Sequence, residues 1–319
     1  MDKTIHKLLD GVKRKDTRSI ARLITLAESG SHAILQAMRQ LYPLTGGATV
    51  IGVTGSTGVG KSCLVDRLIY AYRRDGKSVA VIAVDPSSPR TGGAILGDRI
   101  RMQDHAGDPG VFIRSTASRR HLGGLAVATG EALTILDAAG WEVVLVETVG
   151  IGQAEIEVSE TVQTCVLVLA PNTGDDMQRM KAGIMEIADV FVVNKADIGG
   201  ADLVTSDLQR TLGSVNSAGK QRSVVACSAS RSEGIDEVMK AISEHQQYLC
   251  EHDLLNQVLE KRITSQILSM AQSRIGKMLA PAFSSSSTVE QYVKQILEGK
   301  TDPVTAGEEF AHSLIAGRL

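Results

Sequence analysis

Apolar residues recur at helical spacing through the first part of the chain. Between residues 3 and 44 they return every three or four positions, with charged residues between them, so each group lies on one face of a helix. The groups are Ile5, Leu8, Leu9 and Val12; Ile20, Leu23, Ile24 and Ala27; and Ile34, Leu35, Met38 and Leu41. This pattern predicts two or three short helices ahead of residue 45.

From about residue 48 to residue 227 the pattern changes to short apolar runs separated by helical stretches. Runs rich in Val and Ile predict strands that are buried on both faces. They are ATVIGVTG, SVAVIAVD, EVVLVE, CVLVLAP, VFVVNKAD and SVVACSA. Strands that alternate with helices predict an α/β fold, with a mostly parallel sheet flanked by helices.

After Gly234 the strand pattern stops and helical spacing returns. One broad apolar stripe runs through Leu254, Leu255, Val258, Leu259, Ile263, Ile267, Ala271 and Ile275. The serines at 284–287 predict a loop. We therefore divide the chain into an N-terminal helical extension (1–45), an α/β nucleotide-binding domain (46–250) and a C-terminal helical segment (251–319) whose amphipathic character suggests dimerisation.

Composition narrows the classes of function. A net charge of −2 and 3% aromatic residues provide neither the positive field nor the stacking rings that nucleic-acid binding needs. Four cysteines without a CxxC pair indicate neither a zinc site nor a disulfide framework. The chain shows no signal-peptide pattern and no apolar stretch of 18 residues, so we expect a cytoplasmic protein that contacts neither nucleic acid nor membrane.

A phosphate-binding loop follows the first predicted strand. The segment GSTGVGKS has the spacing GxxxxGKS and precedes a helical pattern. Its glycines let backbone N–H groups point at phosphate oxygens, Lys61 reaches the β and γ phosphates, and Ser62 offers a hydroxyl to Mg²⁺. A nucleoside triphosphate is thus the expected ligand. The residues assigned to the nucleotide here are Gly55, Ser56, Thr57, Gly58, Val59, Gly60, Lys61, Ser62 and Cys63.

An NKxD pattern at the end of a later strand selects the base. Asn194, Lys195 and Asp197 form it, and the Asp carboxylate can accept from both N1–H and the exocyclic amine of guanine. Adenine would leave that acceptor unpaired, at a cost of roughly 10⁴-fold or more in discrimination. A backbone N–H at Ser228 or Ala229 could meet guanine O6. GTP is therefore the predicted nucleotide.

Two predicted strands end in acids, Asp85 and Glu147. The carboxyl ends of parallel strands share one edge of a sheet, where the phosphate loop also lies, so both carboxylates should meet the γ phosphate. A carboxylate beside apolar strands needs compensation, which Mg²⁺ held by Ser62 supplies. Glu147 replaces the Asp of a DxxG switch, and Gly150 completes the motif with an N–H for the γ phosphate.

The residue after Gly150 bears on the rate of hydrolysis. Small signalling GTPases place a water-orienting Gln there, whereas this chain has Ile151, and Gln153 follows two positions later. We expect slow hydrolysis by the isolated chain and stimulation by a partner that orders this loop. The residues assigned to catalysis are Lys61, Asp85, Glu147 and Gln153.

Long ordered motifs carry a resemblance to a known family. AVDPSSPRTGGAILGDRIRM, HLGGLAVATGEA, VLVETVGIGQAE and PNTGDDMQRMKAGIMEIADVFVVNKAD resemble the MeaB/ArgK G proteins from about residue 15 to about residue 275. These are GTPase chaperones of adenosylcobalamin-dependent acyl-CoA mutases such as methylmalonyl-CoA mutase. The resemblance implies a P-loop NTPase fold and a homodimer that gates cofactor loading and protects or reactivates the mutase.

The same resemblance assigns residues. It places Mg²⁺ ligands at Asp85, Asp98 and Glu147, beside Ser62. Switch segments fall on residues 85–102, 147–155 and 172–183. Coupling to the mutase falls on Asp175, Asp176, Gln178 and Lys181. Nothing resembles the DxHxxG motif that grips cobalamin, so no tightly held cobalamin is expected.

The sequence leaves two other functions open. A metal-insertion GTPase would carry His- or Cys-rich tracts, which this chain lacks. A kinase or transport-associated P-loop protein would need an acceptor pocket, and none is evident in the sequence. His105 and His121 lack the spacing of metal ligands, so we interpret both as structural or surface-exposed, and we interpret Trp141 as a packing residue.

Overall fold

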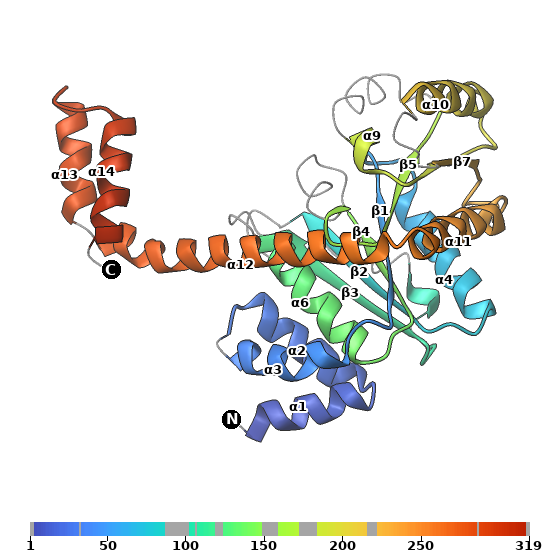
Figure 1. Cartoon of the computed structure of the whole chain (residues 1–319), viewed down its shortest axis with the longest axis horizontal. Helices are drawn as coiled ribbons and strands as arrows, with labels where there is room; N and C mark the ends of the chain where they lie inside the picture. Colours follow the sequence, from blue (N-terminus) through green and yellow to red (C-terminus); the bar gives the residue numbers. More distant parts are fainter. Residues whose placement is uncertain are drawn as a thin grey trace.

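The molecule is built on one seven-stranded sheet with helices on both faces (Figure 1). This computed structural model describes residues 3–31, 33–86, 102–105, 107–118, 124–148, 159–171, 184–215, 222–285 and 287–316. The strand order is β3-β2-β4-β1-β5-β6-β7, and every neighbouring pair is parallel. The predicted α/β architecture with a parallel sheet is confirmed.

Six of the seven strands coincide with the predicted apolar runs, and β3 is the one that the sequence reasoning missed. The strands are β1 (Thr49–Thr54), β2 (Val79–Pro86), β3 (Val111–Ser118), β4 (Val143–Glu147), β5 (Thr164–Leu169), β6 (Val190–Val193) and β7 (Ser223–Ala226). β3 reads VFIRSTAS and pairs only with β2 at the edge of the sheet. An edge strand can carry polar residues, so its apolar run is short.

The helices alternate with the strands and then continue beyond them. They are α1 (Lys3–Lys13), α2 (Thr17–Glu28), α3 (Ala33–Leu41), α4 (Lys61–Arg74), α6 (Gly124–Ala138), α9 (Ile184–Ile187), α10 (Ala201–Val215), α11 (Ile235–Glu251), α12 (Leu255–Ser285), α13 (Ser287–Leu297) and α14 (Pro303–Ala316). Two 3₁₀ turns, η1 (Tyr42–Leu44) and η2 (Gln103–His105), complete the described elements.

The two faces of the sheet bury separate apolar layers. On one face α4 and α11 cover β1, β4, β5 and β6, with Val53, Leu145, Val166 and Ile242 all inaccessible to solvent. On the other face α6 covers β2 and β4 and is itself backed by α1, α2 and α3 (Figure 1). α10 covers β5 and β6 beside it. This double covering holds the carboxyl edge of the sheet, where the phosphate loop begins, in a rigid frame.

The N-terminal helices share a core with the sheet domain. Ile20, Leu23 and Ile24 are fully buried in the same apolar cluster as residues of α6, β2 and β4. Polar contacts add to this packing, because the Lys15 ammonium lies 4.2 Å from the centre of the Trp141 ring and donates to the Gly140 carbonyl at 2.9 Å. The burial of Trp141 agrees with its interpretation as a packing residue.

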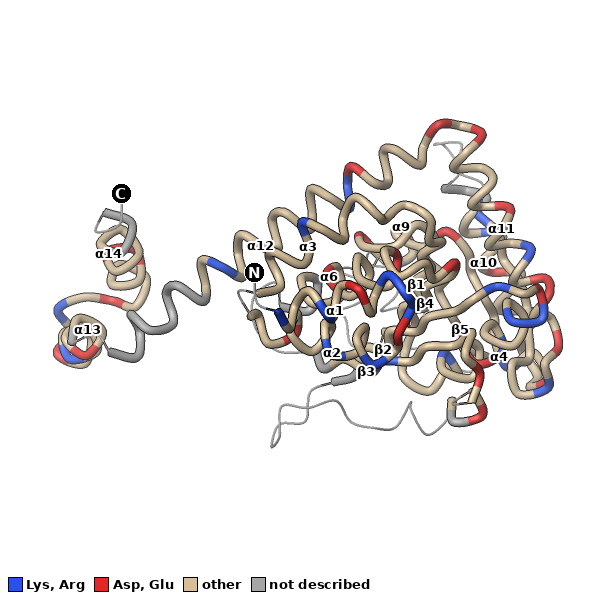
Figure 2. Tube along the Cα trace, turned by 90° about the horizontal axis from the view of Figure 1, so that it is seen from below, with Lys and Arg blue, Asp and Glu red and all other residues tan. Residues whose placement is uncertain are grey.

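The C-terminal helices lead away from the sheet. α12 runs along α6 and continues past it, and α13 and α14 lie beyond its far end (Figure 1). The predicted loop at 284–287 is wrong in extent: α12 includes Ser285 and α13 begins at Ser287. No helix in the described ranges has the length and apolar character that crossing a bilayer requires. Lys and Arg positions intermingle with Asp and Glu positions along the trace (Figure 2).

Candidate functional site

The loop between β1 and α4 has a backbone that only glycine accommodates at two places. Gly55 has φ +143°, and a Cβ there would strike the carbonyl of Val168 on β5. Gly60, directly before α4, has φ +96°, and a Cβ there would strike the Asn194 amide. Both glycines thus permit a tight curl under β5 and β6, ending at the N-terminus of a 14-residue helix. Such a loop can direct N–H groups and a helix dipole at phosphate.

Lys61 folds back over this loop. Its Nζ donates to the carbonyl oxygens of Gly55 at 2.6 Å and Ser56 at 2.9 Å, and the side chain is almost wholly buried. A buried ammonium needs such partners because desolvation disfavours its charge. The lysine is therefore held above the curl of the loop, within reach of any phosphate that the loop binds.

Ser62 and Glu147 meet directly. The Ser62 hydroxyl in the first turn of α4 donates to Oε1 of Glu147 at 2.6 Å, and Glu147 is 3% exposed. The register pairs Val53 with Glu147, so the carboxylate stands one strand away from the start of the loop. A buried hydroxyl and carboxylate are hard oxygen donors, which is the chemistry that Mg²⁺ prefers. The donor set of this contact fits a magnesium ion.

Asp85 reaches the same edge of the sheet. β2 lies beside β4, and the register pairs Ala83 with Glu147, so Asp85 stands two positions further along its strand. The strands that carry Asp85, Glu147 and the phosphate loop are thus consecutive, in the order β2-β4-β1. The structure describes the backbone of Asp85 but not its side chain. The backbone brings the two acids to one edge, as the strand-end pattern predicted.

Asn194 joins the phosphate loop to the predicted base pocket. Its side-chain nitrogen donates to the carbonyl of Val59 at 2.8 Å, and its Oδ1 accepts from the backbone N–H of Ala229 at 3.0 Å. The residue is 2% exposed. Lys195 adds a second link, since its Nζ donates to the Gly58 carbonyl at 2.8 Å. The NKxD segment therefore supports the loop that binds phosphate as well as the base pocket.

Asp197 lies between two groups that favour its charged form. The Ser228 hydroxyl donates to Oδ1 at 2.6 Å, and Nε of Arg231 lies 3.6 Å from Oδ2. The hydrogen bond from Ser228 is the main cause that holds the pKa of Asp197 below its usual value, with Arg231 and Lys195 adding to it. Asp197 is therefore an ionised acceptor at neutral pH, which suits paired N–H donors on a ligand.

The two backbone donors that the sequence offered to guanine O6 have partners within the chain. The N–H of Ser228 donates to the Glu233 carbonyl at 2.9 Å, and that of Ala229 donates to Asn194. Sequence reasoning had no signal for this, because it depends on a pairing across 35 positions. A base carbonyl at this place has to share or replace the contact between Ala229 and Asn194.

Cys227 is a further member of the pocket that the motifs did not indicate. Its Sγ lies 3.6 Å from Oδ1 of Asn194, and burial raises the pKa of the thiol to about 12. The thiol is thus protonated and acts as a weak donor to Asn194.

Seven assigned residues lie outside the described part of the chain. They are Asp98, Gly150, Gln153, Asp175, Asp176, Gln178 and Lys181.

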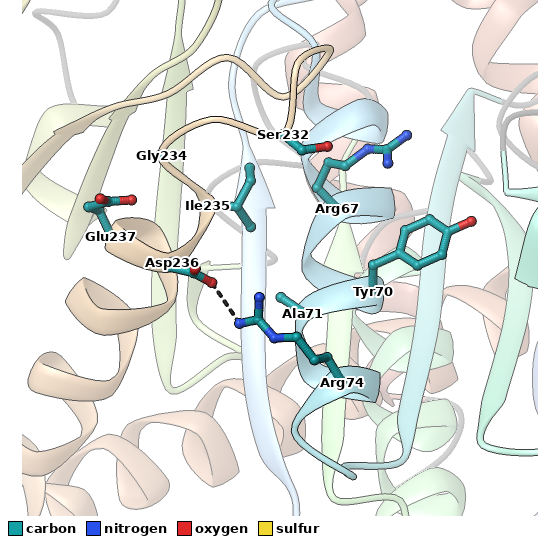
Figure 3. Close-up of a pocket in the computed structure, with 9 residues that line it drawn as sticks. All are labelled: Arg67, Tyr70, Ala71, Arg74, Ser232, Gly234, Ile235, Asp236 and Glu237. Atoms are coloured by element: carbon teal, nitrogen blue, oxygen red, sulfur yellow. Dashed lines mark hydrogen bonds and ion pairs between the residues drawn. The ribbon is translucent and has the colours of Figure 1, made fainter.

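A groove of about 500 Å³ lies next to this site, between α4 and the start of α11 (Figure 3). It is lined by Arg67, Tyr70, Ala71, Arg74, Ser232, Gly234, Ile235, Asp236 and Glu237. The ion pair between Arg74 and Asp236, 2.7 Å long, spans it. Residues 55–62 do not line the groove, so it is separate from the phosphate loop.

His105, in η2, packs against α4 through Asp66 and Tyr70. It is buried, its Nε2 lies 2.9 Å from Oδ1 of Asp66, and its ring packs against Tyr70 with centroids 4.3 Å apart and the ring planes tilted by 55°. These contacts agree with a structural role for His105, and His121 lies outside the described residues.

Comparisons with known proteins identify a matching family and several similar chains. A family model described as methylmalonyl-CoA mutase-associated GTPase MeaB matches residues 20–283. A protein of Pyrococcus abyssi that is named as a candidate GTPase is 44% identical over 320 residues, covering 99% of this chain and 98% of its own. GTPase ArgK of Escherichia coli is 37% identical over 268 residues, 81% of each chain. A crystal structure described as a LAO/AO transport system kinase has a TM-score of 0.71 at 26% identity, covering 98% of this chain and 99% of the other.

Proposed function

This chain belongs to the family of methylmalonyl-CoA mutase-associated GTPases of the MeaB type, and from that premise we propose that it acts as a chaperone and gatekeeper for an adenosylcobalamin-dependent acyl-CoA mutase. The enzyme hydrolyses GTP, as its family and its P-loop fold establish. In the proposed role, the GTP-bound and GDP-bound forms of this protein have different affinities for the mutase. Hydrolysis switches the protein from one affinity to the other and so controls cofactor loading, protection and reactivation. The name of the matching family supports the choice of partner.

One observation carries the proposal of a guanine-dependent switch: Asn194 bonds to both the phosphate loop and the base loop. A change at the base is therefore transmitted to the loop that holds the phosphates. We assign guanine recognition to Asp197, whose carboxylate accepts from N1–H and the exocyclic amine. Ala229 then turns its N–H from Asn194 toward O6, while the Ser228 hydroxyl keeps Asp197 ionised.

At the phosphates, we assign roles to the backbone N–H groups of the loop, to Lys61 and to the oxygen ligands of Mg²⁺. Backbone N–H groups of the loop cradle the phosphates, and Lys61 exchanges the carbonyls of Gly55 and Ser56 for β and γ phosphate oxygens. Ser62, Asp85, Asp98 and Glu147 would hold Mg²⁺, which neutralises developing charge on the phosphate oxygens when bound. Glu147 keeps its carboxylate buried and hydrogen-bonded to Ser62, so the group is positioned beside the first turn of α4 before the nucleotide binds.

Slow turnover is part of the proposal. Ile151 follows Gly150 and cannot orient water, so we assign that role to Gln153 or to a group supplied by the mutase. Single-turnover hydrolysis by the pure protein, with and without the mutase, tests this assignment. Fast turnover that a mutase does not change would overturn it.

A homodimer formed through the C-terminal helices also belongs to the proposal. On α12 the apolar residues Ile263, Ile267 and Ile275 lie on the solvent side, with Ile267 66% exposed, and Leu297 at the end of α13 is 83% exposed. Helical spacing makes the α12 residues one stripe, which a second copy can cover. Light scattering should give twice the 33.9 kDa chain mass for the parent and a monomer for Ile267→Asp.

The experiment that tests the mutase role is a binding series. Candidate adenosylcobalamin mutases are titrated with this protein loaded with GDP or with a non-hydrolysable GTP analogue, and the two affinities are compared. A nucleotide-dependent difference for one mutase supports the role, and equal binding or no binding to all of them overturns it. Lys61→Ala, which removes the phosphate-facing ammonium, serves as the variant that cannot hold nucleotide and should show no such difference.

The alternatives gain no support. No observation favours a metal-insertion GTPase or a kinase or transport role for this chain over the mutase chaperone.

A further inference from the structure

Two buried threonines lie at the junction between the phosphate loop and the end of β4. The hydroxyl of Thr148 donates to the hydroxyl of Thr54 at 3.0 Å, and each residue is 1% exposed. Thr54 is the last residue of β1 and directly precedes Gly55, whereas Thr148 directly follows Glu147. Each threonine is therefore one residue away from a part of the site.

A backbone bond reinforces this contact. The N–H of Thr148 donates to the carbonyl of Val53 at 3.1 Å, which extends the pairing of β1 and β4 one residue beyond Glu147. Together with the bond from Ser62 to Glu147, three contacts join the end of β4 to the phosphate loop and its helix. The hydroxyl pair is the last of them, just before the chain continues toward Gly150.

A hydroxyl pair in this position is more than a way to fill space. Two valines would occupy nearly the same volume without needing any partner, whereas a buried hydroxyl is costly unless it is hydrogen-bonded. Other buried threonines in the described part of the chain, such as Thr129 on α6, have a hydroxyl without a hydrogen-bond partner. The bond between Thr54 and Thr148 restricts the χ1 angle of both side chains and so defines where β4 ends relative to the loop.

We propose that Thr148 and Thr54 form a positioning pair that aligns the carboxylate of Glu147 with the phosphate loop, and thereby sets the preference for GTP over GDP. This inference rests on the proposed role of Glu147 at the magnesium ion and the γ phosphate. The pair contacts no phosphate itself in this assignment. It acts by keeping the carboxylate of Glu147 at the place beside Ser62 that a magnesium-bound triphosphate requires.

The test is Thr148→Val, which preserves shape and removes the bond. Calorimetry should show that affinity for a non-hydrolysable GTP analogue with Mg²⁺ falls about tenfold, the effect of losing roughly one hydrogen bond. The dissociation constant for GDP without Mg²⁺ should change by less than about threefold relative to the parent. Thr148→Ser keeps a hydroxyl and should restore the parental ratio of the two affinities. Thr129→Val is the matched control and should leave both affinities unchanged.

Thr54→Val provides an independent route to the same answer. It should reproduce the loss of Thr148→Val, and the double variant should lose little more, because each change removes the same bond. If Thr148→Val does not fold, Thr54→Val, compared with Thr129→Val, still decides the matter. Variants that lower only the melting temperature, with the ratio of GTP to GDP affinity intact, would overturn the proposal and leave the pair a packing feature. A parent protein that does not bind GTP would instead overturn the proposed function.

Discussion

The hydroxyl of Ser62 and the carboxylate of Glu147 form a buried hydrogen bond of 2.6 Å between the first turn of α4 and the last residue of β4. This contact explains why the apolar strand β4 ends in Glu147. The carboxylate has a hydroxyl partner beside the phosphate loop, where a divalent cation and a triphosphate would both gain from its charge.

Glu147→Gln tests the charge at this contact, because it keeps the shape of the side chain and removes only the negative charge. The amide oxygen can still accept from Ser62, so the fold should persist, but the negative charge is lost. We expect affinity for a GTP analogue in Mg²⁺ to fall about 10- to 100-fold, and affinity measured in EDTA to remain near the parental value. Glu142→Gln, which alters a carboxylate before the other end of the same strand, should change neither. An equal loss with and without Mg²⁺ would contradict the assigned role.

Asp197→Asn should change the preferred base. The variant loses a carboxylate that accepts from two N–H groups of guanine and gains a donor that can meet the second carbonyl of xanthine. Equilibrium titrations should show GTP binding weakened by at least about a hundredfold and XTP binding strengthened relative to the parent. Asp202→Asn, in the first turn of α10, is the control and should leave both unchanged. If ATP competes with GTP as an equal in the parent, the base assignment is wrong.

Ser228→Ala should move the pH at which guanine binding is lost. The hydroxyl of Ser228 is the main cause that lowers the pKa of Asp197, so its removal raises that pKa. Recognition needs the ionised carboxylate, and binding therefore weakens as pH falls through the pKa. The variant should lose GDP affinity at a higher pH than the parent does.

The measurement for this variant is a set of GDP dissociation constants between pH 7 and pH 3, a range that extends below the ordinary Asp pKa of about 3.9. The constants are expressed as the ratio of variant to parent so that the titration of GDP cancels. Ser230→Ala is the control: its hydroxyl lies 3.2 Å from that of Ser228, and no contact with Asp197 is found for it within the described residues. A constant ratio across the range would show that Ser228 does not control the charge of Asp197.

Much of the fold was predictable because buried parallel strands are recognisable as apolar runs in the sequence. Strands such as β1 and β5 are buried on both faces and therefore read as uninterrupted apolar runs. β3 was missed because Arg114 and the polar residues after it lie at the edge of the sheet, where Arg114 pairs with Glu28 of α2. Local spacing can show an apolar face but cannot show which partner covers it, so the shared core of the N-terminal helices was also unpredicted.

The parts of the site that could be predicted are those formed by residues close together in the sequence. The phosphate loop and the NKxD segment were found from spacing, and the common edge of Asp85 and Glu147 followed from the rule for parallel strands. The contacts that depend on distant pairings were not: the link from Asn194 to Val59 spans 135 positions, and that from Thr148 to Thr54 spans 94. Chain geometry, rather than local sequence, brings these groups together.

Asp137 offers a test of how the N-terminal helices are joined to the sheet. This residue of α6 accepts three backbone N–H groups, from Gly46 at 2.8 Å, Gly47 at 3.1 Å and Ala48 at 3.0 Å, just before β1 begins. Replacing it with Ala leaves these donors without their partner. The free energy of unfolding should fall by about 1–3 kcal/mol, the usual cost of losing partners to charge-assisted hydrogen bonds.

Asp137→Asn should give an intermediate loss, because the amide oxygen can still accept from two of the donors while the amide nitrogen cannot accept from the third. Urea unfolding followed by circular dichroism should give a free energy of unfolding that decreases from the parent to the Asn variant and again to the Ala variant. Asp10→Ala on the exposed face of α1 is the control and should stay within about 0.5 kcal/mol of the parent. Equal stability of all four proteins would mean that apolar packing alone, through residues such as Ile20 and Leu23, holds the helices on the sheet.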